Sequence, residues 1–309
     1  MDNTIDILYY EYMQELASNN QQILECIVGS KCVDILKENG QDVIFEGNVL
    51  TSITKFIKNL FDKVIGFFKK IIDFITGKNK TTTSDGKEVK KSINLHLITK
   101  CEEKMKSFKA EDRNKFKLEH ADPSKSVKHN VEEIDKIFDK HSKLLNPIME
   151  TIGNTQVFAP SHDYVERDNK TIDELSNKES IAKEDISFNN IVNILSSYKE
   201  SEKRINELKG KLESSIKQME EYKKKAENVK PTEETQKKWV DIKNYIIAAT
   251  NTMVKAARAN VNLELFAFNS QESILKKFVE FKSESSKSES FIDSDAEYEN
   301  FLYEMYQAE

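Results

Sequence analysis

Side chains able to bind a metal or to act in acid–base catalysis gather in one part of the chain. All five histidines fall within one 67-residue stretch that also holds Cys101. Imidazole is the commonest protein ligand for metals, so a metal site is one interpretation. No two histidines have the three- or four-residue spacing that places both rings on one helical face, and the best such couple is His129 with Glu133. The spacing favours surface histidines without a metal or cofactor, at His96, His120, His129, His141 and His162.

The sequence contains no motif that would organise a reaction. It has no P-loop, dinucleotide fingerprint, HExxH, GxSxG or EF-hand pattern. Loops that cradle phosphate groups need glycine, and the whole chain has only 8 glycines. No nucleophile can be paired with a nearby base, so we predict no enzymatic activity and no catalytic residue.

The composition favours long helices. The chain of 309 residues is 38% hydrophobic and 32% charged, with 8 glycines and 4 prolines. An all-β fold needs turn residues every 8–12 positions or so, which this chain cannot supply. The three cysteines form no CxxC pair, and the acidic N-terminus does not resemble a signal peptide, so we expect a reducing compartment. The sequence contains no run of about 18–20 uncharged apolar residues, so we expect no ordinary transmembrane helix.

The chain divides into five regions that together predict a mainly α-helical fold. Its main feature is a long antiparallel, coiled-coil-like helical hairpin, accompanied by a smaller helical N-terminal part and an amphipathic helix. The regions are an acidic helical leader (1–46), the amphipathic helix (47–80), a mixed helical and loop region (81–188), the hairpin (189–281) and an acidic flexible tail with an aromatic docking segment (282–309).

The mixed region has the least regular pattern. Periodicity predicts one helix over residues 92–118 and another over residues 127–150, the second interrupted near Pro147. Residues 153–187 are polar and only weakly periodic, which predicts a long loop with at most one helical turn.

A heptad pattern predicts the hairpin. Apolar residues recur every seven positions over residues 191–226, with a second row offset by three that two serines weaken. Pro231 stands where the turn is expected, and a matching pattern returns over residues 239–281. Small residues in the return helix, such as Ala249 and Ala256, would let the two helices approach closely.

Residues 49–76 carry the clearest periodicity in the chain. Their apolar side chains fill about half of the helical circle, charged residues fill the rest, and Gly77 is a C-cap candidate. One interpretation is an interfacial helix on an anionic membrane surface. The other, more usual in soluble proteins, is a stripe buried against the hairpin or a neighbouring subunit. The residues expected to face the membrane or the partner are Ile53, Phe56, Ile57, Leu60, Val64, Phe67, Phe68, Ile71, Phe74 and Ile75.

Charge is unevenly distributed along the chain. Residues 1–46 hold nine acidic residues against two lysines and residues 283–309 hold eight against one, whereas the region between them is basic. The acidic ends either keep the chain soluble or dock onto the basic body or a basic partner, and salt would weaken such docking. Lysines alternate with glutamates along the hairpin, which has only two arginines, so we expect no specific nucleic-acid binding.

The residues around position 46 resemble a processing site. Ile44-Phe45-Glu46-Gly47 is similar to the pattern cut by prohead proteases of large contractile-tailed bacteriophages, which cleave after Glu in a bulky-apolar, any, Glu sequence before a small residue. The acidic leader resembles the capsid-targeting propeptides of internal head proteins. With the Lys-, Asn- and Ile-rich composition, this resemblance implies a phage of a low-GC host and cleavage between Glu46 and Gly47.

We therefore expect a non-enzymatic virion structural protein, made in the host cytoplasm and carried inside the head or ejected from it. It would assemble through its helices with other virion proteins or with copies of itself. The alternatives are a membrane-active helical toxin and a cytosolic coiled-coil adaptor that binds a partner through its tail. The tail residues expected to dock are Phe291, Tyr298, Phe301, Tyr303 and Tyr306.

Overall fold

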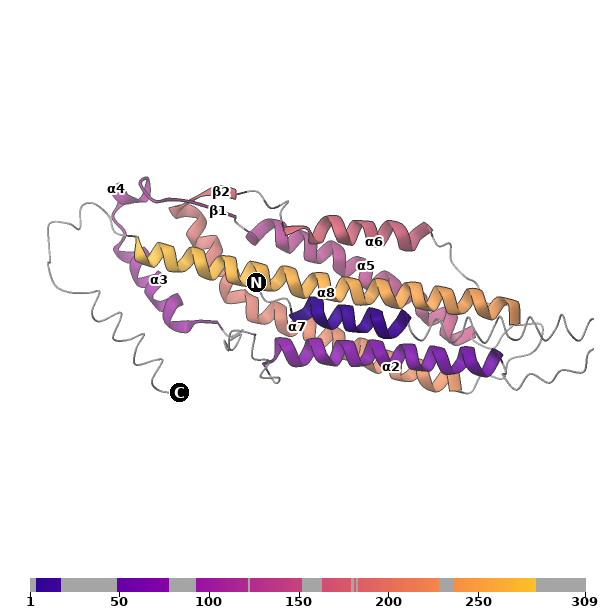
Figure 1. Ribbon diagram of the computed structural model, residues 1–309. Helices are drawn as coiled ribbons and strands as arrows, with labels where there is room; N and C mark the ends of the chain where they lie inside the picture. Colours follow the sequence, from indigo (N-terminus) through magenta and orange to yellow (C-terminus); the bar gives the residue numbers. More distant parts are fainter. Residues whose placement is uncertain are drawn as a thin grey trace, which may run out of the picture.

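The computed structural model is mainly helical (Figure 1). It describes residues 4–17, 49–77, 93–121, 123–151, 163–178, 181, 183–227 and 236–281. After an N-terminal helix (residues 4–17), the elements are α2 (Val49–Ile75), α3 (Leu95–Ser107), α4 (Ala110–Arg113), β1 (Lys117–Ala121), α5 (Pro123–Thr151), α6 (Asp163–Ser176), β2 (Lys183–Ser187), α7 (Phe188–Glu227) and α8 (Gln236–Glu280).

The predicted hairpin is confirmed as the pair α7 and α8. The first heptad row of α7 is buried along its whole length, from Ile191 to Ala226. The α8 residues Ala249 and Ala256 are fully buried, so the neighbouring helices pack close to the α8 backbone. The Ser201 hydroxyl of the α7 seam is satisfied within its own helix, because it donates a hydrogen bond to the carbonyl of Tyr198 at 2.6 Å.

Helix α8 is the central element of an elongated bundle. In Figure 1 the N-terminal helix and α2 lie along one side of α8, and α5 and α6 lie along the other. Side chains from all of these helices meet in one large apolar core, to which α7 also contributes. With neighbours on so many sides, α8 is buried over most of its circumference, and the buried residues include polar ones such as Thr250, Asn260 and Gln271.

A second apolar core closes one end of the bundle, where α3 and the strands meet the start of α7 and the end of α8. The ring of Phe108 stacks on that of Phe188 with centroids 5.0 Å apart, and Phe278 of α8 lies 5.5 Å from Phe108. The Lys104 ammonium donates to the carbonyl of Val279 at the C-terminal end of α8, where the helix dipole favours a positive charge.

The helix predicted over residues 92–118 is wrong in its second half. Helix α3 ends at Ser107 because Phe108 adopts an extended backbone (φ −72°, ψ 111°). This conformation places the Phe108 ring in the second apolar core, at the end of the bundle. The chain then forms the short helix α4 and the strand β1, which pairs antiparallel with β2. Lys117 is opposite Ser187 in this two-stranded sheet.

The loop with a single helical turn predicted over residues 153–187 is wrong over the part that the structure describes, residues 163–178 and 183–187. Residues 163–176 form α6, which buries only a few apolar side chains, among them Val165 and Ile172, against α5 and α8. So few buried positions leave a weak periodic signal in the sequence. The predicted interruption near Pro147 is wrong as well, because α5 continues through this proline to Thr151.

Candidate functional site

The apolar stripe of α2 lies inside the molecule. Phe61 and Phe68 are fully buried, and their rings lie 5.7 Å from Tyr222 of α7 and 6.0 Å from Phe138 of α5. The Ile53 side chain lies outside the described part of the structure. The other nine stripe residues expected to face a membrane or a partner are all buried: Phe56, Ile57, Leu60, Val64, Phe67, Phe68, Ile71, Phe74 and Ile75.

Charged residues fix the edges of α2 on the hairpin. The Lys58 ammonium lies 2.7 Å from the Glu227 carboxylate of α7, and Lys223 of α7 pairs with Asp62 of α2. The φ of Gly77 is +67°, as expected for a glycine that ends a helix. The structure thus shows α2 buried against the hairpin, and none of the helices in the described ranges is long and apolar enough to cross a bilayer.

The N-terminal helix docks in a groove between α2 and α8 and closes this side of the core. Ile5, Tyr12 and Leu16 are buried along its inner face. The Tyr12 hydroxyl donates a hydrogen bond to the Asn251 side-chain oxygen of α8 at 2.7 Å, and the Tyr12 ring lies 5.6 Å from that of Phe67 of α2. Burial raises the pKa of the Tyr12 phenol, so this group stays protonated and keeps its role as donor.

Three acidic side chains of the same helix each meet a cation of the body. This is the docking of an acidic end on the basic body, one of the two interpretations of the charge pattern. A hydrogen bond from Lys63 lowers the pKa of Glu15. The side chains are partly exposed, so each pair contributes roughly 0.2–1 kcal/mol and is weakened by salt. The pairs are Asp6–Arg258 at 2.6 Å, Glu11–Lys70 at 3.1 Å and Glu15–Lys63 at 2.6 Å.

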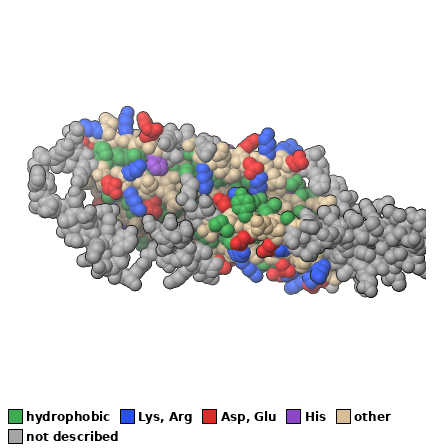
Figure 2. Space-filling view, in the orientation of Figure 1, with side chains coloured by type: hydrophobic (Ala, Val, Ile, Leu, Met, Phe, Trp, Pro, Cys, Tyr) green, Lys and Arg blue, Asp and Glu red, His purple; other side chains and the backbone are tan. Residues whose placement is uncertain are grey.

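The outer face of the N-terminal helix exposes two large apolar side chains among polar ones. Ile7 is 57% exposed and Tyr10 is 66% exposed. Figure 2 shows an apolar patch near the middle of the face it displays, in the region of this helix and bordered by charged side chains. A space of about 340 Å³ between this helix and α2 is lined by Leu8, Lys63 and Phe67, among others. The N-terminal helix therefore packs against α2 and α8 but does not fill the groove between them completely.

A second hollow, of about 430 Å³, lies between α5 and α7 with α8 as its floor. The carboxylate of Glu264 is buried there, and the Arg204 Nε donates to both of its oxygens, at 3.1 and 3.0 Å. The same guanidinium also donates to the Ser197 carbonyl at 3.1 Å. Sequence periodicity did not reveal this buried pair, because both residues look like ordinary charged positions on solvated helix faces.

Two carboxylates of this hollow, Asp135 and Glu264, are paired with cations. Burial raises the pKa of Asp135 and that of Glu264, and the nearby Lys211 and Arg204 oppose these shifts. Lys211 lies 3.0 Å from Asp135, and the Asn260 amide donates to the same carboxylate at 2.6 Å. Because each of these two carboxylates has its own cation, the geometry supports a structural ion-pair network rather than an acid–base pair.

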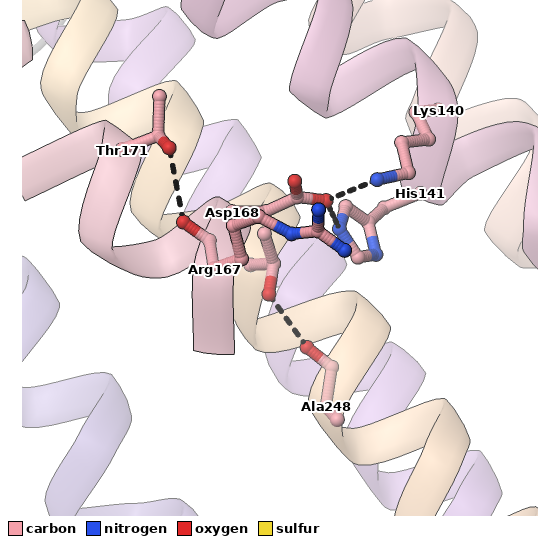
Figure 3. Close-up of polar contacts among 7 residues, drawn as sticks. Lys140, His141, Arg167, Asp168, Thr171 and Ala248 are labelled. Carbon is pink, nitrogen blue, oxygen red and sulfur yellow. Dashed lines mark hydrogen bonds and ion pairs between the residues drawn. The ribbon is translucent and has the colours of Figure 1, made fainter. Parts of the chain in front are cut away.

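One histidine occupies a position that the sequence did not predict. His141 was expected at the surface, but it is fully buried between α5, α6 and α8. Figure 3 shows His141 and Lys140 of α5 approaching the same carboxylate, Asp168 of α6. The His141 Nε2 lies 2.8 Å from Asp168 Oδ2, and the Lys140 ammonium lies 2.7 Å from it. Burial lowers the pKa of His141 more than the attraction of Asp168 raises it, so the ring is neutral in the fold.

We expect His141 to weaken the fold as the pH falls. Its pKa is depressed in the folded state, so its contribution is complete above the unfolded value of about 6.5 and is lost on acidification, at up to about 1.4 kcal/mol per pH unit. Urea unfolding at pH 7.5 and pH 5.0 measures this loss. His141→Gln should flatten the difference, whereas the exposed control His129→Gln should keep it. Equal pH dependence in the two variants would contradict the assignment.

The remaining candidate groups do not assemble into a reactive site. Cys101 is buried, and burial raises its pKa to about 11, so its thiol is protonated at neutral pH. His96 and His129 are exposed and far from each other in the chain. Within the described residues, no group of three or more His, Cys, Asp or Glu side chains could hold a metal ion.

Several predicted site residues lie outside the described residues. They include the processing positions Glu46 and Gly47, and also His162. The tail residues expected to dock fall outside them as well: Phe291, Tyr298, Phe301, Tyr303 and Tyr306.

Comparisons with protein-family models, with curated proteins and with solved structures found no match to this chain. Its function must therefore be inferred from its own residues. Of the features described above, the groove that holds the N-terminal helix has the most specific contacts, namely the Tyr12–Asn251 hydrogen bond and three ion pairs. These ion pairs also fit one of the two interpretations of the charge pattern.

Proposed function

We propose that this protein is a non-enzymatic structural component of a tailed-bacteriophage particle, made in the host cytoplasm and carried inside the head or ejected with its contents. The observation that carries the proposal is the Ile44-Phe45-Glu46-Gly47 motif, which separates an acidic leader from the rest of the chain. Cleavage after Glu46 would remove the leader during maturation of the head.

The arrangement of the helices supports such a cut. Helix α2 begins at Val49, so cleavage between Glu46 and Gly47 leaves every element from α2 to α8 in one chain. The N-terminal helix would then be held by non-covalent contacts alone. An isolated helix of about this length is marginal in water, so its dissociation is favoured once the connection is cut.

Because the apolar stripe of α2 is buried, we propose that the protein acts through contacts with other proteins and not through contact of α2 with a membrane. Membrane contact would require α2 to leave α7 and α8, which would open the large core. Exposed apolar side chains of the retained part, such as Leu95 and Val192, remain available for contacts with other virion proteins or with further copies of this chain. The toxin alternative loses its main argument for the same reason.

The test is the mass and the N-terminal residue of the protein recovered from purified particles and from infected cells. We expect full-length chains in cells and chains that begin at Gly47 in particles. A Glu46→Gln variant should remain full-length. The control Glu150→Gln, in Ile148-Met149-Glu150-Thr151, which also loosely fits the bulky-apolar, any, Glu pattern, should be processed normally. Full-length chains in particles would contradict removal of the leader, and absence of the protein from particles would contradict the virion role.

A further inference from the structure

The last twelve residues of the chain repeat the chemical pattern of the N-terminal helix. Residues 5–16 are IDILYYEYMQEL and residues 298–309 are YENFLYEMYQAE. With residue 5 aligned to residue 298, Tyr, Glu and Gln coincide at the central positions, and apolar, aromatic and acidic residues match at most of the others. Both segments have a net negative charge and no lysine or arginine. The tail therefore resembles the segment that occupies the groove in its acidic and aromatic composition.

Two acidic positions that form ion pairs across the groove are matched in the tail. Glu299 corresponds to Asp6, which pairs with Arg258, and Glu304 corresponds to Glu11, which pairs with Lys70. Met305 corresponds to the buried Tyr12, and a methionine can fill an irregular apolar space beside aromatic rings. The tail copy is thus equipped for two of the three ion pairs and for the central apolar contact.

Three positions make the tail copy the weaker ligand. Glu15, which pairs with Lys63, corresponds to Ala308, and the buried Leu16 corresponds to Glu309. Met305 also cannot replace the hydrogen bond that the Tyr12 hydroxyl donates to Asn251. These losses favour the N-terminal helix whenever both segments compete for the groove. The tail would take the groove only after the N-terminal helix has left.

The polarity and length of the chain suit docking within one molecule. Asp6 contacts Arg258 and Asn262 of α8, whereas Tyr12 contacts Asn251, so the N-terminal helix runs antiparallel to α8. The first docked residues therefore lie about 27 Å along α8 from its last residue, Glu280. The connection to residue 298 has a root-mean-square length of roughly 22 Å and a maximum of about 55 Å, so it spans this distance in the required direction.

We propose that residues 298–309 bind the groove between α2 and α8 of their own chain when the N-terminal helix is displaced. The displaced helix leaves Lys63, Lys70 and Arg258 without their acidic partners beside an apolar surface. An acidic aromatic segment tethered nearby supplies the missing charge and covers that surface. This inference depends on the groove and on the repeated sequence, and it does not require cleavage after Glu46.

Zero-length carbodiimide cross-linking of the full chain, read by mass spectrometry, tests the proposal. The native protein should give Glu11–Lys70 and Glu15–Lys63 links. A release variant carrying Asp6→Asn, Glu11→Gln, Tyr12→Ser and Glu15→Gln should instead link the acidic residues of 299–309 to Lys63 or Lys70. Adding Glu299→Gln and Glu304→Gln should greatly reduce those new links. The Asp62–Lys223 and Asp173–Lys255 links should persist throughout, because they report an intact bundle.

Two outcomes of this experiment overturn the proposal. One is a release variant that keeps the bundle links but gives no link from the tail to the groove. The other is found by mixing nitrogen-15-labelled and unlabelled copies of the release variant. Tail links that form only between copies would assign the tail to a neighbouring molecule instead of its own chain.

A second measurement uses a milder variant whose folding is little affected. Asp6→Asn, Glu11→Gln and Glu15→Gln together remove the partly exposed ion pairs and leave the buried Ile5, Tyr12 and Leu16 in place. A fluorescent synthetic peptide of residues 298–309 should bind this variant more tightly than the native chain, whose groove is occupied by the N-terminal helix. Adding Lys70→Glu should weaken the binding roughly fivefold, whereas the matched control Lys69→Glu, at an exposed residue of the same helix, should not. No binding to the variant, or equal weakening by the two lysine substitutions, counts against the groove as the site.

Discussion

Replacement of Phe68 by alanine is expected to lower the free energy of unfolding by about 3–5 kcal/mol, as measured by urea denaturation. Phe68 is fully buried, and its ring lies 6.0 Å from that of Phe138 of α5 and 6.2 Å from that of Phe67. The truncation removes apolar surface from the core and leaves a cavity where α2 meets the bundle. A loss of this size would be a large fraction of the stability of an ordinary domain.

The matched control is Lys69→Ala, the next residue on the exposed face of α2. It should change the free energy of unfolding by less than about 0.5 kcal/mol. The comparison separates the two interpretations of the α2 stripe. If the stripe were a membrane-facing surface, Phe68→Ala would leave stability almost unchanged and would instead weaken binding to anionic vesicles.

The long helices could be predicted from sequence because their periodicity extends over many turns. The α2 stripe and the heptad rows of α7 and α8 each repeat over 27 residues or more, so a few polar intruders such as Ser201 do not obscure the pattern. Gly77 marked the end of α2 correctly. Pro231 lies outside the described residues, between the end of α7 and the start of α8. In these regions, local preference and tertiary packing favour the same structure.

The short elements could not be predicted because distant contacts decide them. Strand β1 exists through its pairing with β2, and the two are separated in sequence by α5 and α6. Phe108 stops α3 because its ring is needed in a core built from α7 and α8. A single sequence gives no information on which distant segments will meet.

The candidate sites also divide into features that the sequence indicates and features that depend on contacts between distant segments. Docking of the N-terminal helix was foreseen in outline from the uneven charge, although the particular pairs, such as Asp6 with Arg258, depend on the fold. His141 was misplaced because a lone histidine in a polar helix has the same sequence context whether it faces solvent or α6. The Arg204–Glu264 pair was missed because α7 and α8 are rich in exposed charges.

Removal of the Arg204 side chain is expected to have an effect as large as that of Phe68→Ala. In Arg204→Leu the Glu264 carboxylate remains buried without its cation, which costs about 3–5 kcal/mol in the free energy of unfolding at pH 8. The control is Lys203→Leu, because Lys203 is the exposed neighbour of Arg204 and pairs only weakly, at 3.8 Å, with Glu207. That variant should be nearly as stable as the native chain.

The pH dependence and a double variant distinguish a buried charge from lost packing. Burial already raises the pKa of Glu264, and without Arg204 the negative charges of Asp135 and Glu207 raise it further. An acid whose folded pKa is raised favours the fold below its unfolded pKa of about 4.5 and loses that contribution as the pH rises through the folded value. Arg204→Leu should therefore recover stability between pH 8 and pH 5. Arg204→Leu with Glu264→Leu should recover most of it at pH 8, because no buried charge remains. If the double variant were as unstable as the single one at every pH, the loss would come from the shape of the arginine side chain and not from its charge.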